Sequence, residues 1–77
     1  MHLHLGGHLS WYEPQKRSRI DIHLAEPTLL VKVLRDLGIP HGEIAVVVVN
    51  GAPIFALGDI RVSNDDQVEL FPPVGGG

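Results

Sequence analysis

The sequence predicts an α+β roll in which one main helix packs on a mixed sheet of four to five strands. Two N-terminal stretches, MHLHL and RIDIHL, alternate apolar and polar residues with the period of half-buried strands. A single amphipathic segment, EPTLLVKVLRDLGIP, follows them, and β-branched or alternating stretches fill much of the C-terminal half. With 77 residues the chain suits one domain, which we expect to span residues 1–77.

The two N-terminal stretches predict a hairpin with a long connection. Their apolar positions are expected on the core side of the sheet: Met1, Leu3, Leu5, Ile20, Ile22 and Leu24. The connection, GGHLSWYEPQK, is rich in turn formers and polar residues. Because a wholly exposed tryptophan would leave a large apolar surface in water, Trp11 and Tyr12 are expected to pack against the edge of the core.

The segment after the hairpin predicts the helix. Pro27 suits its first turn, where the missing N–H costs nothing. Gly38 fits the position just past the helix, and Pro40 prevents continuation. The apolar face has the spacing i, i+3, i+4, i+7: Leu30, Val33, Leu34 and Leu37.

The C-terminal half predicts a further hairpin and a last strand. AVVVVN indicates a strand, Asn50-Gly51 a two-residue turn, and APIF a short edge partner, since Pro53 has no N–H for a ladder. ALGDIRVSNDDQ is expected to be mostly loop, and QVELFP the last strand. A right-handed crossover would lay the helix on one face of the sheet. The β-grasp, or ubiquitin-like, arrangement is the simplest topology with this order.

Residues 45–49 are apolar at every position, which usually indicates burial on both faces of a sheet. A one-helix roll covers only one face. Either valine serves here as a good strand former and loops cover the second face, or a partner docks on the open face, because contiguous exposed apolar area marks interaction sites.

Composition excludes several classes of function. The chain has no cysteine, so disulfides, thiolate metal sites and thiol nucleophiles are impossible. No apolar run approaches the roughly 20 residues of a membrane span. The net charge is −3, and Lys16, Arg17 and Arg19 form the only basic cluster, expected to be solvated, which argues against nucleic acid. We expect a cytoplasmic protein without membrane or nucleic-acid partners.

The chain has five histidines, a high number for its length. His2 and His4 would share a strand face at a spacing that can chelate zinc, copper or nickel, and His8 and His23 lie on or near neighbouring elements. Solvent-facing imidazoles explain the pattern more simply, so neither a metal nor another cofactor is expected. The acidic residues of the C-terminal region suit turns and a solvated face, and we assign no catalytic residue.

The chain ends FPPVGGG. Phe71 is expected to end the last strand, and Pro72 and Pro73 cannot extend its ladder. The three final glycines, residues 75–77, could thread a passage that side chains would block. Residues 72–77 are therefore expected to form a flexible tail, about 20 Å long when extended at about 3.3 Å per residue. Such a tail could deliver its carboxylate into another protein's active site.

Taken together, the β-grasp order, VVVNG before the short hairpin, VSNDDQVELFPPV and the terminal glycines resemble the MoaD/ThiS family of ubiquitin-like sulfur carriers. The resemblance covers nearly the whole chain and is most specific toward the C-terminus. Val62 stands where leucine is usual, and Asp65 where glycine is usual. HLSWYEPQKRSRI lacks the phenylalanine-rich opening common in the molybdopterin branch.

The resemblance implies that a ubiquitin-activating-type enzyme uses ATP to adenylate the carboxylate of Gly77. Sulfur would then replace AMP, giving a thiocarboxylate. Gly75 and Gly76 would fill the narrow entry channel. The residues before them would orient the tail and contact partners: Phe71, Pro72, Pro73 and Val74. The protein would be a carrier and cosubstrate, not an enzyme.

The sulfur acceptor implied is an enzyme such as the large subunit of molybdopterin synthase, because Pro-Pro-Val and the length favour molybdopterin or tungstopterin synthesis. A carrier for thiamin thiazole or another sulfur metabolite is the first alternative. The second is a ubiquitin-like modifier joined to lysines through Gly77. The third is a non-covalent binding module that uses the face of residues 46–49.

Overall fold

The computed structural model describes residues 1–55 and 57–73. Five strands form its main sheet, in the order β2-β1-β7-β4-β5. Strands β1 and β7 pair in parallel, and the other three neighbouring pairs are antiparallel. The strands are β1 (His2–Leu5), β2 (Arg19–Asp21), β4 (Val46–Val49), β5 (Ala52–Ile54) and β7 (Gln67–Phe71).

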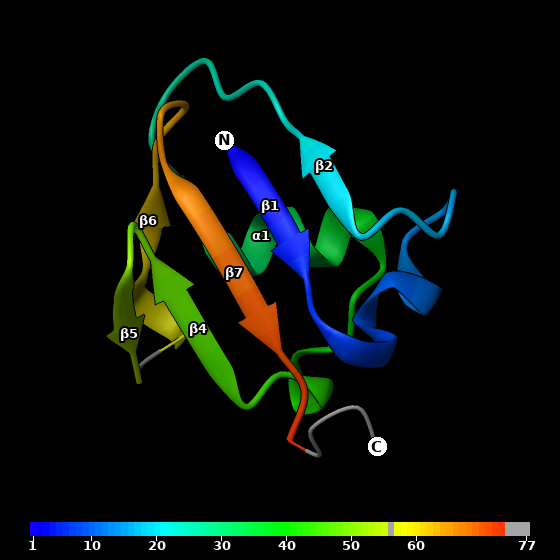
Figure 1. Cartoon of the computed structure of the whole chain (residues 1–77). Coiled ribbons are helices and arrows are strands. Elements are labelled where there is room, and N and C mark those ends of the chain that lie inside the picture. Colours follow the sequence, from blue (N-terminus) through cyan, green and yellow to red (C-terminus); the bar gives the residue numbers. More distant parts are fainter. Residues whose placement is uncertain (56, 74–77) are drawn as a thin grey trace.

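One α-helix, α1 (Leu30–Leu37), crosses behind this sheet and covers one of its faces (Figure 1). The mixed five-stranded sheet with a single main helix confirms the predicted β-grasp roll. No helix in the described part of the chain is long and apolar enough to cross a membrane.

Side-chain alternation builds the core as predicted. Leu3 and Leu5 of β1 and Val68 and Leu70 of β7 face the helix and are buried, because successive strand residues point to opposite faces. They meet the buried helix residues Leu30, Val33 and Leu34, and Leu37 packs against this cluster. Burial of this apolar area is the main stabilising term for a domain of this size.

The helix ends where expected but begins later. Gly38 adopts the left-handed conformation with φ 79° and its N–H caps the last turn. The prediction that Pro27 lies in the first helical turn is wrong, since α1 begins at Leu30. The two residues before it instead form β3 (Thr28–Leu29), which pairs with β6 (Arg61–Val62). That pairing holds the backbone extended, so the helix cannot start at the proline.

The β4–β5 hairpin turns at Asn50 and Gly51, whose φ angles of 51° and 83° are both positive, as a two-residue primed turn requires. β5 lies at the sheet edge, as Pro53 predicted. The segment expected to be mostly loop contains the 3-10 helix η3 (Leu57–Asp59) and β6. A further 3-10 turn, η2 (His41–Glu43), follows α1.

The long β1–β2 connection contains a 3-10 helix, η1 (Gly7–Tyr12). Its inward position is taken by Leu9, which is fully buried. Because a 3-10 helix has three residues per turn, Trp11 then points away from the core. The expectation that Trp11 packs against the core edge is therefore wrong: 73% of it is exposed. Tyr12, at 37%, is only partly covered and lies edge-on to His8.

Candidate functional site

The end of β7 is where the predicted tail begins. Phe71 is the last residue of the strand and pairs with Val46, and its carbonyl accepts a hydrogen bond of 2.8 Å from the N–H of Ala45. Pro72 then ends the ladder because it has no N–H. The structure places Pro72 in a buried position and Pro73 in an exposed one. Four other predicted site residues lie outside the described residues: Val74, Gly75, Gly76 and Gly77.

A close backbone approach fixes the ring of Phe71. Gly6 is buried and its N–H donates to the carbonyl of Leu70 at 2.8 Å. A Cβ on Gly6 would lie 2.7 Å from Cδ1 of Phe71 and 2.9 Å from the same carbonyl, closer than atoms normally pack. His4 contacts the ring edge-on at a centroid distance of 6.3 Å. The last strand residue before the tail is thus held in one orientation.

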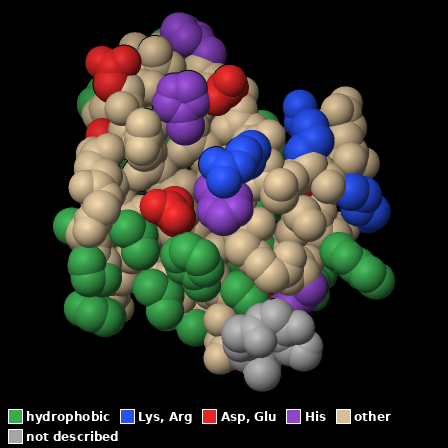
Figure 2. Space-filling model, in the orientation of Figure 1, with side chains coloured by type: hydrophobic (Ala, Val, Ile, Leu, Met, Phe, Trp, Pro, Cys, Tyr) green, Lys and Arg blue, Asp and Glu red, His purple; other side chains and the backbone are tan. Residues whose placement is uncertain are grey.

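The sheet face opposite α1 has an apolar part beside this strand end. Val46 is 39% exposed, Val48 and Phe71 are half-buried, and Pro53 is exposed. These four residues, here called the outer patch, are cross-strand neighbours on β4, β5 and β7. Figure 2 shows apolar side chains gathered on the lower part of this face. The described loops leave the outer patch partly open, which the docking interpretation of residues 45–49 requires.

The other part of the same face is polar and hollowed. A shallow depression of about 500 Å³ lies over β1, β2 and β7. Each histidine on it faces one carboxylate of a neighbouring strand: His2 is bonded to Asp21, and Nδ1 of His4 lies 3.8 Å from Oε2 of Glu69. Acidic and histidine side chains are interleaved here in Figure 2. Among residues 1–55 and 57–73 no group of three or more potential metal ligands converges.

The acidic turn before β7 has a structural role. The side chain of Asp66 accepts hydrogen bonds from Nδ2 of Asn50 at 2.9 Å and from the N–H of Ser63 at 2.7 Å. Both bonds favour the charged form, and they lower the pKa of the Asp66 carboxyl. The N–H of Gln67 in turn donates to Oδ1 of Asn50 at 2.9 Å. The β4–β5 turn is thereby tied to the start of β7.

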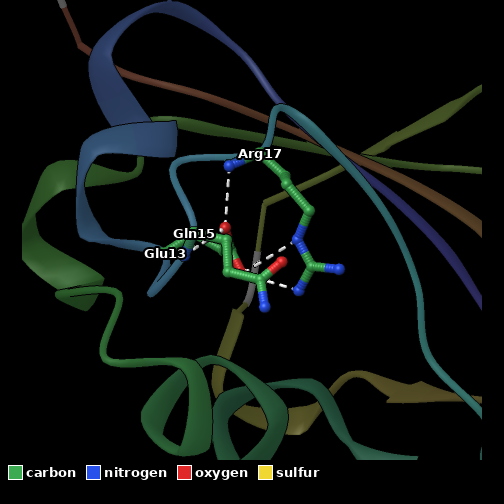
Figure 3. Close-up of polar contacts among 3 residues, drawn as sticks. All are labelled: Glu13, Gln15 and Arg17. Atoms are coloured by element: carbon green, nitrogen blue, oxygen red, sulfur yellow. Dashed lines mark hydrogen bonds and ion pairs between the residues drawn. The ribbon is translucent and has the colours of Figure 1, made fainter.

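A buried carboxylate that the sequence interpretation missed organises the β1–β2 connection. Glu13 is inaccessible to solvent, and Figure 3 shows its carboxylate facing the guanidinium of Arg17. Oε1 accepts from Nη2 of Arg17 at 2.8 Å and from Nε at 3.2 Å. Oε2 accepts from the backbone N–H groups of Arg17 at 2.7 Å and Gln15 at 3.0 Å. The Arg17 side-chain bonds, opposed by desolvation, lower the pKa of Glu13 to about 2.

Arg17 lies exposed in the loop, as expected, but its guanidinium is also paired with this buried carboxylate, which the expectation did not include. One feature of the sequence could have identified this pair: Glu13 and Arg17 are four residues apart, with Pro14 between them. The other histidine of this region, His8, lies with its Nε2 atom 3.2 Å from Oε2 of Glu43, so η1 is also joined to η2.

Comparison with known proteins identifies a family. A family model described as ThiS family matches residues 12–77, a range that contains the predicted tail and begins at the last residue of η1. Carriers of this family work with adenylating and sulfur-accepting enzymes. No curated protein and no solved structure matches the chain.

Proposed function

Because the chain belongs to the ThiS family, which supports a role as a sulfur carrier, we propose that it carries sulfur as a thiocarboxylate on Gly77. The observation that carries this proposal is the match of the family over the predicted tail, together with the strand end at Phe71 from which that tail would leave. The tail residues 72–77 would carry the terminal carboxylate away from the folded domain.

The chemistry assigns the hard step to a partner. A carboxylate is a poor acyl donor because its leaving group would be oxide. In the first step an oxygen of the Gly77 carboxylate attacks the α-phosphorus of ATP, pyrophosphate leaves, and an acyl-adenylate forms. A hydrosulfide equivalent then attacks the acyl carbon, AMP leaves, and a proton is released. The carrier is a cosubstrate in this scheme, and ATP is bound by the adenylating enzyme.

The folded domain positions the tail for this transfer. The Gly6 backbone and His4 hold Phe71 in place. Pro72, the first residue beyond the strand, is buried and so fixes the start of the tail on the domain. Pro73 and Val74 would direct the chain outward, and Gly75 and Gly76 would occupy a channel too narrow for side chains. Binding of the tail costs conformational entropy, so a receiving enzyme must enclose it firmly.

For the acceptor we propose the large subunit of a molybdopterin or tungstopterin synthase, in the cytoplasm. The Pro72-Pro73-Val74 sequence and the chain length support this branch. A test is to charge the carrier and offer it in parallel to this large subunit and to a thiazole synthase. Sulfur transfer to the pterin precursor is expected. Transfer only in the thiazole reaction would assign the carrier to thiamin.

The carrier chemistry itself is tested by reconstitution with the host's adenylating enzyme, ATP and sulfide. Intact mass should increase by the exchange of one oxygen for one sulfur. Two control proteins should not react: a variant lacking Gly76 and Gly77, and one extended by alanine after Gly77. Conversion of the extended variant would contradict the proposal, and isopeptide-linked products on lysine would favour the modifier.

A further inference from the structure

The β1–β2 connection displays the chain's single tryptophan on a tightly built turn. We call residues 7–17 the Trp11 turn. Trp11 is 73% exposed, although tryptophan carries a large apolar surface that water solvates poorly. Neither the carrier chemistry nor the tail uses this residue. Exposed tryptophan and neighbouring arginine are the residue types most enriched among the energetically dominant contacts of protein interfaces.

The polar groups of the turn hold the tryptophan's backbone in place. The carboxylate of Glu13 accepts four hydrogen bonds, from Arg17 and Gln15, inside the protein. Lys16 adopts a left-handed backbone with φ 60°, which is unfavourable for a residue with a Cβ. Its ammonium donates to the carbonyl of Trp11 at 2.6 Å. Such strain persists where surrounding contacts over-determine the conformation, and it is concentrated at functional sites.

A rigid anchor is advantageous for binding. Ordering a mobile loop on association costs free energy that a preorganised loop does not lose. The Trp11 turn is ordered within the free domain by contacts to its own buried carboxylate. Its indole is therefore presented to a partner at little additional entropic cost.

Charge indicates the kind of surface that would receive it. The turn and the start of β2 contain Lys16, Arg17 and Arg19 against one carboxylate, Glu13, whereas the whole chain has a net charge of −3. The side chain of Arg17 is still 48% exposed although it is paired with Glu13. An exposed indole on a turn that carries these cations, with the Lys16 ammonium bonded to the Trp11 carbonyl, complements an apolar pocket rimmed by Asp and Glu. Because the rest of the chain is acidic, an acidic partner would be repelled elsewhere and steered to this turn.

Position connects the turn with the tail. Gly6, the residue before η1, is packed on the ring of Phe71 and bonded to Leu70, so the turn starts beside the last residues of β7 (Figure 1). A protein that encloses a tail starting at Pro72 therefore comes over the end of the domain that carries the turn. The glycines of the tail have no side chains by which one carrier could be told from another. Selection must come from the folded surface nearby.

We propose that the Trp11 turn is a second binding site for the adenylating enzyme, with Trp11 inserted into an apolar pocket rimmed by carboxylates. This inference rests on the proposed function, because it assumes that such an enzyme activates Gly77. The first part of the turn, residues 7–11, which includes Trp11, precedes the range that the family model matches. The contact is therefore assigned to this chain's own surface rather than to the shared tail.

The single tryptophan allows a direct test. The full chain is labelled with 5-fluorotryptophan, and its one ¹⁹F resonance is followed during titration with the purified adenylating enzyme of the host. The resonance should shift or broaden to saturation and lose its dependence on the H₂O/D₂O ratio. The variant without Gly76 and Gly77 should produce the same change at higher enzyme concentration, because the turn binds separately from the tail.

Calorimetry in the same samples separates two failures. If the unlabelled chain does not bind the enzyme, the proposed function fails and this inference fails with it. If the chain binds while the ¹⁹F resonance stays unchanged, only the inference is overturned. A shift caused by anionic vesicles or by a single-stranded oligonucleotide, with none caused by the enzyme, would also overturn it.

Kinetics supply a second readout. Trp11→Ala should raise the KM for the carrier in adenylation by about thirtyfold, as for a dominant interface residue, with kcat little changed because the tail is intact. The matched control is Phe55→Ala, which removes another aromatic, 90% exposed, next to β5 at the opposite edge of the sheet. Equal KM values for the two variants and the parent chain would refute the inference. Circular dichroism verifies that both variants fold.

Discussion

In the described part of the chain, two turns place a residue other than glycine in the left-handed backbone region, and they do so by different means. In the β4–β5 hairpin it is Asn50, with φ 51°, a residue type that tolerates this conformation and bonds its neighbours through its own amide. In the Trp11 turn it is Lys16, with φ 60°, which has no such tolerance. There the conformation is imposed by the buried carboxylate of Glu13. The conformation of the β4–β5 turn thus follows from the chemistry of Asn50 itself, whereas that of the Trp11 turn follows from the buried side chain of Glu13.

The largest effect is expected from removing the buried carboxylate. Glu13→Ala should lower the Tm more than any other change considered below, because Arg17 and two backbone N–H groups lose the buried carboxylate that accepts their hydrogen bonds. The Trp11 turn should then become mobile, seen as faster amide exchange of residues 13–17. An unchanged Tm and unchanged exchange would show that the carboxylate does not hold the turn.

The same carboxylate predicts a pH dependence. The folded pKa of Glu13, about 2, lies below its ordinary value of 4.5. The stabilisation is therefore complete above the unfolded-state pKa and is lost as the pH falls from about 5 toward 2. Glu13→Gln should reduce this acid-induced loss in thermal unfolding between these pH values. An identical pH profile for Glu13→Gln and the parent chain would contradict this assignment.

A steric change at Gly6 should have the next largest effect. Gly6→Ala would bring a Cβ within 2.7 Å of the ring of Phe71 and 2.9 Å of a backbone carbonyl. Overpacking of this kind costs about 1–3 kcal/mol of the free energy of unfolding. Denaturant-induced unfolding of Gly6→Ala and the parent chain measures this loss of free energy. Gly42→Ala, where a Cβ meets nothing within 4 Å, is the control and should be nearly neutral.

The asparagine turn should be less sensitive, because its interactions lie at the surface. Asn50→Ala removes two hydrogen bonds and places a Cβ residue in the left-handed region, for a loss of about 2 kcal/mol. Asn50→Gly removes the same bonds without the backbone strain and should cost about 1 kcal/mol. Both should raise the pKa of Asp66 toward its ordinary range, since the Asn50 amide is the main cause of its lowering. Equal losses for the two variants would disprove the contribution of strain.

The smallest effect is expected at Lys16. Lys16→Gly relieves left-handed strain but increases the entropy of the unfolded chain, so the free energy of unfolding should change by less than about 1 kcal/mol. Both variants lose the bond from the Lys16 ammonium to the Trp11 carbonyl, but Lys16→Ala also keeps the strain, so it should be the less stable of the two. If Lys16→Ala proved the more stable, the strain would not be borne at this residue.

The contrast between the turns also explains what the sequence could predict. Asn50-Gly51, Gly38 and the alternation of β1 act through neighbouring residues, and all three predictions were confirmed. The start of α1 depends on pairing between Thr28 and Val62, far apart in the chain, and the sequence pattern alone placed it too early.

Of the candidate site, the strand end at Phe71 can be compared with the structure, whereas residues 74–77 lie outside the described residues and their roles stay predictions. Phe71 does end the last strand, as its position before two prolines indicated. The exposure of Trp11 and the burial of Glu13 were missed, because they depend on which residue of η1 faces the core. Leu9 takes that position, and composition could not reveal it.

The most direct test of the carrier assignment is the intact mass of the protein isolated from its native host, with fragmentation to locate any change. The account predicts a species in which one oxygen is exchanged for sulfur, localised to Gly77. Only unmodified chain, from cells that express the adenylating enzyme, would contradict it.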